Sequence, residues 1–318
     1  MPEKVRVTKQ TLRLVDDTYA HPNTSTLIFR FEPKDSSTTL VRLQKASIKH
    51  ALIGAKDLYL IDDFFLPHEA KDLHDFSTKT TFSRHSYGSP EAIAKGEKPA
   101  LSMNGKERWQ FFSSPPAAVS ELYQLFGMLS EKLFVDITTL PWELCDAASH
   151  GSPAVIANRL ERASIESREL GKHQDCDPQK RISFAIPVLY SNEKDVHPNR
   201  FENGSFGKPW LVSLMLYTSD PNYNPAYRMG TVFYSTNDQI ALRVNCSNMR
   251  LVLFEGDILH SIEESQIPTG MNTWRISYVF KLIINPKEAT TSAKKTFFDL
   301  LNRTSCIECL PVGPDMRV

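Results

Sequence analysis

The feature that most restricts the fold is a series of short apolar segments between about residues 154 and 284. Polar loops rich in Asn, Pro and Gly separate these segments, which is typical of strands in a β-sandwich or barrel. The segments are AVIANRL (154–160), ISFAIPVLY (182–190), WLVSLMLY (210–217), GTVFYS (230–235), MRLVLFEGDILH (249–260) and WRISYVFKLII (274–284).

Two helical patterns precede this strand-rich region. The stretch DLYLIDD (57–63) predicts a strand and a turn, and Pro67 and Glu69 then favour the first turn of a helix. A longer helix is predicted after Ser113-Ser114-Pro115-Pro116, because apolar residues recur at spacings of three and four and form one packing stripe. That stripe consists of Val119, Leu122, Tyr123, Phe126, Leu129 and Leu133. The chain is therefore predicted to be mainly β with supporting helices (α+β).

The two ends of the chain carry weaker patterns. Alternating apolar residues over 5–14 and the run TLIFRF (26–31) predict strands, whereas DSSTT (35–39) is typical of a turn. Residues 293–302 are amphipathic, and the remaining tail SCIECLPVGPDMRV (305–318) is expected to be loose. We therefore divide the chain into an N-terminal β extension (1–50), a main domain (51–287) and a C-terminal helix with its tail (288–318).

Composition argues against several classes of partner. Lys plus Arg and Asp plus Glu number 37 each, so no net charge attracts the chain to nucleic acid or an anionic membrane. The N-terminus lacks the apolar core of a secretory signal, and the longest apolar run, 210–217, is too short to span a bilayer. The five cysteines are scattered, and Cys306 and Cys309 have zinc-like spacing without a second pair, which favours free thiols. We expect a cytoplasmic protein with no membrane contact.

The residues that indicate chemistry are His173, Asp175 and His260. On an extended segment residues two apart share a face, so the imidazole of His173 and the carboxylate of Asp175 can converge. His260 follows the apolar strand and Glu-Gly-Asp turn of LVLFEGDILH, which can bring a second imidazole to the first pair. Two histidines and one carboxylate on one face leave three open metal positions, as in non-haem Fe(II) oxygenases. Taken separately, His173 and Asp175 can also be a surface hydrogen-bonded pair, and His260 a core histidine.

A buried cation is the next indication. Arg275 and Ser277 share one face of an otherwise apolar predicted strand, WRISY (274–278). A guanidinium in such a place requires an anion, and a ligand carboxylate is one candidate, with the Ser277 hydroxyl as a second donor. The alternative is an ion pair between Arg275 and Glu263 or Glu264.

The order His173-x-Asp175, GTVFYS, LVLFEGDILH and Arg275-x-Ser277 resembles the 2-oxoglutarate/Fe(II) dioxygenases, most closely their prolyl-hydroxylase-like branch. The stretch from Asp57 also resembles the start of that branch, so the resemblance covers about residues 57–285. It implies a double-stranded β-helix (a cupin-like jelly roll) with His173, Asp175 and His260 as iron ligands. Arg275, Ser277 and Asn158 would contact 2-oxoglutarate.

This sequence also departs from the pattern of that family. Leu160 stands near Asn158 where relatives often have Tyr, Met229-Gly230 replaces a Gly-Gly pair, and the gap between His260 and Arg275 is longer than usual.

The function implied by the resemblance is hydroxylation of a substrate C–H bond with Fe(II), 2-oxoglutarate and O2, with ascorbate as an optional reductant. The leading expectation is a prolyl or other side chain of a protein or peptide. A free amino acid or small metabolite is the alternative substrate, and a non-catalytic metal-binding jelly-roll module is the alternative without turnover. Nucleic-acid dealkylation is disfavoured for two reasons. The chain has balanced charge, and the second arginine that such enzymes carry a few residues after the first is missing, since Ser277-Tyr278-Val279-Phe280-Lys281 stands there.

Two long loops, 191–210 and 218–229, are expected at the mouth of the barrel, where substrates enter. Tyr223, Tyr227, Arg228 and Trp210 are therefore either substrate contacts or ordinary loop residues. The remaining histidines receive no role. His21, His50, His68, His74, His85 and His197 are expected to be solvated, and His150 is left unassigned.

Overall fold

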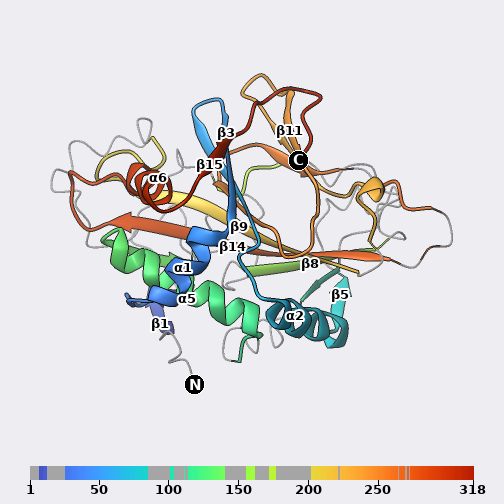
Figure 1. The fold of residues 1–318 in the computed structure, drawn as a ribbon, viewed down its shortest axis with the longest axis horizontal. Coiled ribbons are helices and arrows are strands. Elements are labelled where there is room, and N and C mark those ends of the chain that lie inside the picture. The colour runs from blue at the N-terminus through green and yellow to red at the C-terminus, as the bar shows by residue number, and fades with distance from the viewer. Residues whose placement is uncertain are drawn as a thin grey trace.

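The structure is a computed structural model. It describes residues 7–12, 26–84, 101–103, 111, 114–139, 155–161, 172–176, 202–220, 223–263, 265–268, 271 and 273–318. The segment 182–190, most of the loop 191–210, and His21, His85, His150, His197 and Glu264 lie outside these residues. Within them the chain is a mixed α/β protein with a large β content in two sheets, an arrangement compatible with a β-sandwich (Figure 1).

Twelve strands of the described residues form the major sheet. In order across it they are β1 (Val7–Leu12), β2 (Thr26–Phe31), β7 (Val135–Thr139), β14 (Trp274–Pro286), β9 (Trp210–Ser219), β12 (Leu251–Glu255), β4 (Lys56–Asp62), β3 (Ser47–Ile53) and β15 (Ile307–Cys309). A branch of β8 (Val155–Glu161), β6 (Leu101–Met103) and β5 (Phe82–Arg84) pairs with the first part of β14. Because β1 to β3 belong to this sheet, the N-terminal residues are continuous with the main domain.

The minor sheet contains β11 (Ile240–Val244), β10 (Thr231–Tyr234) and β13 (His260–Ile262) in that order. His260 was expected at the end of a strand, but it begins β13. A 3-10 turn over Pro225–Tyr227 lies in the loop that leads into β10.

Strict alternation along the strands divides the interior into two cores. On β12, Leu251 and Leu253 belong to the larger cluster, whereas Val252 and Phe254 belong to the smaller one between the two sheets. The helices cover the larger cluster: α1 (Ser37–Lys45), α2 (Pro67–Lys79), α5 (Ala117–Lys132) and α6 (Ala293–Thr304). Figure 1 shows α1, α2 and α5 on one side of the long strands and β11 on the other. The major sheet is therefore the middle layer of three.

The helix predictions for 67 onwards and for 119–133 are confirmed. All six residues of the predicted stripe are buried on α5 and its C-terminal cap. In α2 the Glu69 carboxylate accepts the Leu66 backbone N–H at 2.8 Å and both oxygens accept from Arg42 Nη1. This carboxylate therefore stabilises the helix N-terminus and links it to α1.

Two local predictions were wrong. The stretch 35–39 is not a simple turn, because Ser36 accepts the Thr39 N–H at 3.3 Å and α1 begins at Ser37. Residues that favour turns are also the residues that cap helices, and here the cap is formed. The tail after α6 is not loose either: Ile307–Cys309 forms β15, parallel to β3. Cys306 and Cys309 are exposed free thiols, as predicted.

A buried ion-pair network joins α6 to the major sheet. Lys294 Nζ lies 2.5 Å from Glu255 Oε1 and 3.2 Å from Asp57 Oδ2. His50, which was expected to be solvated, is 8% exposed and its Nε2 lies 2.6 Å from Asp57 Oδ1. The expectation failed because β3 alternates, so that this imidazole faces α6 and stacks on Tyr59. Helix α6 is therefore attached by both apolar packing and charge.

Glu255 gives this network a predicted pH dependence. Burial raises the pKa of Glu255 from 4.5 to about 7, although Lys294 and the Asp57 N–H oppose the shift. The folded state then keeps a proton that the unfolded state loses near pH 4.5, so the contribution of Glu255 to stability falls as pH rises from 4.5 to 7. We expect the unfolding free energy of wild type relative to Glu255→Gln to fall by about 2 kcal/mol between pH 5 and pH 7.5. Urea denaturation of both proteins at several pH values measures this, and parallel stability profiles would contradict it.

No helix in the ranges that the structure covers combines the length and apolar character needed to cross a bilayer.

Candidate metal centre

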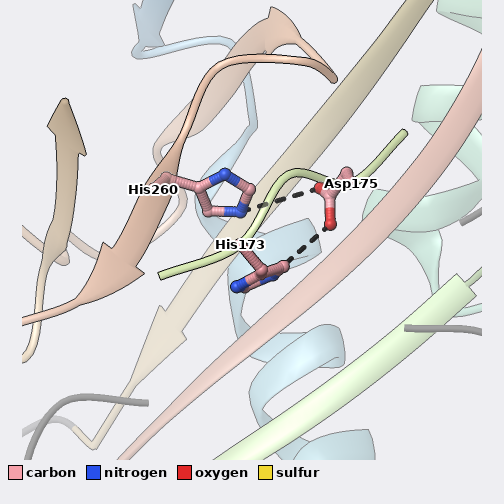
Figure 2. Close-up of side chains that lie close together, drawn as sticks. All are labelled: His173, Asp175 and His260. Carbon is pink, nitrogen blue, oxygen red and sulfur yellow. Dashed lines mark ion pairs between the residues drawn. The ribbon is translucent and has the colours of Figure 1, made fainter. Parts of the chain in front are cut away.

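Three side chains from two distant parts of the sequence converge at one point, as predicted. His173, Asp175 and His260 each offer one ligand atom, and these atoms all lie within 4.8 Å of one another. His173 Nε2 is 3.6 Å from Asp175 Oδ1, and His260 Nε2 is 3.8 Å from Asp175 Oδ2. Figure 2 shows both imidazoles directed toward the carboxylate. His173 remains 41% exposed while Asp175 and His260 are buried, so the cluster opens on the His173 side.

Backbone hydrogen bonds fix the two segments that carry these ligands. His173 and His260 form an isolated antiparallel bridge in which each backbone N–H donates to the other's carbonyl at 3.0 Å. The N–H groups of Asp175 and Cys176 both donate to the Gly256 carbonyl, at 2.7 and 3.1 Å. A Cβ on Gly256 would lie 2.5 Å from Cys176 Sγ, so a larger residue there would force the Cys176 side chain to move. The convergence is therefore built into the main chain.

His260 is prepared to bind a metal through Nε2. Its Nδ1 lies 2.9 Å from the Ile258 carbonyl, a contact that places the proton on Nδ1 and leaves the Nε2 lone pair free. Burial lowers the pKa of His260 from 6.5 to about 4, against the opposing effect of Asp175. Phe254 and Phe233 pack against the ring, with centroids 4.9 and 5.9 Å away. A neutral, fixed imidazole at neutral pH is what a divalent metal requires.

Asp175 has two further partners, Lys281 and Ser213, that were not predicted. Lys281 Nζ lies 2.7 Å from Oδ1, and Ser213 Oγ donates to Oδ2 at 2.6 Å. Lys281 is only 2% exposed. Burial by itself raises the pKa of Asp175, but Lys281 and the two histidines outweigh it and hold that pKa well below the usual range. The carboxylate is therefore ionised and oriented before any metal binds.

The signal for Lys281 was present in the sequence. Arg275, Ser277 and Lys281 have the same parity on β14, and the alternation that placed the first two on one face extends to the third. Ser213 on β9 is the register partner of Lys281. Val279, the position of the same parity between Ser277 and Lys281, packs against the smaller core. One face of β14 therefore carries the polar groups, while its other face packs against the helices.

Arg275 is fully buried, and its guanidinium interacts with Ser277, Tyr217 and Cys246 among the described residues. Nη1 donates to Ser277 Oγ at 3.2 Å, and the guanidinium carbon lies 5.0 Å from the centroid of the Tyr217 ring. Nε and Nη2 have no hydrogen-bond partner among the described residues. Its charge also opposes the burial-driven rise of the Cys246 pKa, which reaches about 11. A buried cation with unsatisfied donors points to a missing anion.

The alternative pairing of Arg275 with Glu263 is not observed. Glu263 instead binds Arg317 through both carboxylate oxygens, and Arg243 Nε lies 3.7 Å from it. Of the other predicted site residues, Asn158 pairs in register with Ser277, although only its backbone is described. Trp210 was a candidate substrate contact, but it is 0% exposed and packs on Phe297 of α6, so it is a core residue.

The remaining loop residues lie near the surface. Tyr223 and Tyr227 are half-buried and their rings meet edge to face at 5.9 Å, and Arg228 is exposed. The Tyr223 hydroxyl donates to the Arg228 carbonyl. The role of Tyr223, Tyr227 and Arg228 as substrate contacts therefore stays a prediction.

The donor set fits a divalent transition metal. Nitrogen and oxygen ligands lie about 2.1 Å from such an ion, so neighbouring ligand atoms are about 3 Å apart at right angles. The observed separations of 3.6 and 3.8 Å need a contraction of less than about 1 Å, and the widest pair, within 4.8 Å, needs up to about 2 Å, which side-chain rotations can supply. His173, Asp175 and His260 could therefore hold a metal ion.

Comparison with known proteins adds nothing to this geometry, since neither the family models nor the curated proteins gave a match to the chain.

Proposed function

We propose that this protein is an Fe(II)- and 2-oxoglutarate-dependent oxygenase. The observation that carries the proposal is the convergence of His173, Asp175 and His260, with ligand atoms within 4.8 Å. Two imidazoles and one carboxylate on one side of an ion leave open positions for a bidentate 2-oxo acid and dioxygen. On this proposal the two sheets are those of a double-stranded β-helix, with the minor sheet and the middle of the major sheet enclosing the metal.

Arg275 supports 2-oxoglutarate as the cosubstrate. Its unsatisfied Nε and Nη2 can bind the distal carboxylate bidentately, with Ser277 Oγ beside them. Arg275 and Asp175 are connected by the polar face of β14, because Lys281 on that face binds Asp175. A dicarboxylic acid that binds the metal at one end and Arg275 at the other would satisfy the orphaned donors.

The residues around the site have distinct roles in this proposal. Fe(II), 2-oxoglutarate and O2 would supply the oxidation of a substrate C–H bond. Lys281 and Ser213 hold the Asp175 carboxylate in one orientation. Phe233 and Phe254 exclude water from the His260 side of the cluster. The exposed side of His173 is where a substrate can approach.

The substrate proposed is a prolyl or other side chain of a protein or peptide, and a free amino acid or small metabolite is the alternative. Nucleic-acid dealkylation remains disfavoured because the chain has equal numbers of basic and acidic residues. The missing second arginine carries less weight, since Lys281 provides a second buried cation on the same strand face.

Turnover without a prime substrate tests the proposal. We expect purified protein to bind one Fe(II) under anaerobic conditions and, with O2 and ascorbate, to convert 2-oxoglutarate slowly to succinate. Protein stripped with a chelator should form no succinate until Fe(II) is restored. Metal binding without any consumption of 2-oxoglutarate would instead favour the non-catalytic metal-binding module, and failure to retain any divalent cation would contradict both.

A further inference from the structure

The C-terminal tail, residues 310–318, is an additional strand-like segment of the minor sheet. Arg243 of β11 donates its N–H to the Met316 carbonyl and accepts from the Val318 N–H, both at 3.0 Å. Asn245 then donates to the Val318 carbonyl at 2.6 Å. Leu310, Met316 and Val318 pack against the smaller core. The tail therefore covers the edge of β11 that faces away from β10 (Figure 1).

One side chain of the tail reaches across the sheet. Arg317 donates from both Nη atoms to the two carboxylate oxygens of Glu263, with the Nη1 bond at 2.8 Å, and Nη1 also donates to Asn245 Oδ1 at 3.1 Å. The Glu263 side chain is only 7% exposed. Ordinary surface ion pairs contribute little, but a bidentate pair on a buried carboxylate is of the stronger kind.

Gly230 makes this reach possible. Thr231 pairs with Val244 on one side and Ile262 on the other, and the Glu263 N–H donates to the Gly230 carbonyl at 2.9 Å. Glu263, Gly230 and Asn245 thus form the next row across the sheet. A Cβ on Gly230 would lie 2.1 Å from the Val244 carbonyl oxygen, so the central position of that row must lack a side chain. The Glu263 carboxylate can then extend over it toward Arg317.

Glu263 directly follows β13, which begins with the metal ligand His260 and is only three residues long. β13 is the last strand of its sheet, and beyond it lies the isolated bridge from His260 to His173. The backbone of β13 is held by its register with β10, and the ion pair between Arg317 and Glu263 is a side-chain attachment at its end. Loss of the Arg317 pair would leave the buried Glu263 carboxylate with Arg243 Nε at 3.7 Å, three residues from a ligand.

We propose that Arg317 is a positioning residue for the metal centre: by holding Glu263 it fixes β13 and so the place of His260, which couples docking of the C-terminal tail to metal binding. This inference rests on the metal centre of the proposed function but not on its oxygen chemistry. Coupling between two sites is reciprocal. If docking of the tail raises the affinity for the metal by some factor, a bound metal must favour docking of the tail by the same factor.

The test measures both directions with Co(II) as the probe. We expect Arg317→Ala to raise the Co(II) dissociation constant about fivefold or more, the lower end of common coupling factors, and Arg317→Lys to recover part of the loss. Asp315→Ala, at an exposed position of the same tail, is the matched control and should bind Co(II) as the wild type does. In the wild type, saturating Co(II) should slow hydrogen exchange at the backbone amides of Asn245 and Val318 by a similar factor.

Each result has a definite meaning. Normal Co(II) affinity in Arg317→Ala, or an exchange rate at Asn245 and Val318 that Co(II) does not change, overturns the coupling. If Arg317→Ala fails to fold, the exchange measurement on the wild type still decides. A wild type that binds no Co(II) overturns the metal centre itself and the proposed function with it, whereas Co(II) binding without coupling overturns this inference alone.

Discussion

Replacing Arg275 by methionine is expected to suppress turnover at 2-oxoglutarate concentrations that saturate the wild type, while leaving the metal-free protein at least as stable as the wild type. The guanidinium is 0% exposed and its Nε and Nη2 have no partner among the described residues. Removing an unpaired buried charge should raise the unfolding free energy by about 1–2 kcal/mol or leave it unchanged. Loss of a bidentate, charge-assisted contact should raise the KM for 2-oxoglutarate about 100-fold or more. Urea denaturation and succinate assays measure the two effects.

Arg250 provides the matched control for this prediction. It is also buried, but its Nε and Nη2 bind both oxygens of Asp62 at 2.8 Å. Arg250→Met leaves that carboxylate unpaired and should cost about 3 kcal/mol, without a specific effect on the KM for 2-oxoglutarate. If Arg275→Met destabilises as much as Arg250→Met and leaves the KM unchanged, Arg275 is a structural residue and the cosubstrate assignment is wrong.

Lys281→Met is expected to give the largest loss of stability in the metal-free protein. The substitution leaves the Asp175 carboxylate buried with Ser213 as its hydrogen-bond donor, and breaking a buried pair in this way costs about 3–5 kcal/mol. A bound divalent cation can neutralise the same carboxylate. Saturating Co(II) should therefore stabilise Lys281→Met more than it stabilises the wild type, which urea denaturation with and without Co(II) would show.

The control for Lys281 is Lys287, which lies just beyond the end of the same strand. Lys287 is 31% exposed and its Nζ is 3.8 Å from Asp136, so Lys287→Met should cost less than about 1 kcal/mol and show no dependence on Co(II). Equal effects of the two substitutions, or a deficit in Lys281→Met that Co(II) leaves unchanged, would mean that Lys281 does not serve the metal ligand.

The sequence predicted the parts of the site that follow from local periodicity. Alternation on extended segments placed His173 with Asp175 and Arg275 with Ser277, and the strands and helices that carry the core were recognisable from periods of two and of three to four. The same alternation extends to Lys281. Its partner could not be found that way, because contact between β14 and residue 175 is a product of tertiary folding.

The failures had a common physical origin. Ser36 and the residues after it suit a turn and a helix cap equally well, and only packing of α1 against α5 decides between them. The C-terminal tail was expected to be loose because the last residues of a domain often are, yet its backbone pairs with β11 through hydrogen bonds that any residue can make. The burial of His50 was missed because its contacts with Asp57 and with α6 form only when the chain folds.

The two faces of β14 have a consequence for substitutions in this strand. Even-numbered residues such as Ile276, Tyr278 and Phe280 pack beneath the helices, while Arg275, Ser277 and Lys281 lie on the opposite face, where Lys281 contacts Asp175. Alternate residues of one strand therefore serve packing on one face and polar contacts on the other. Substitution of Arg275 or Ser277 can therefore change the bound ligand while the packed face stays intact, whereas Lys281 is tied to folding because the buried Asp175 carboxylate depends on it.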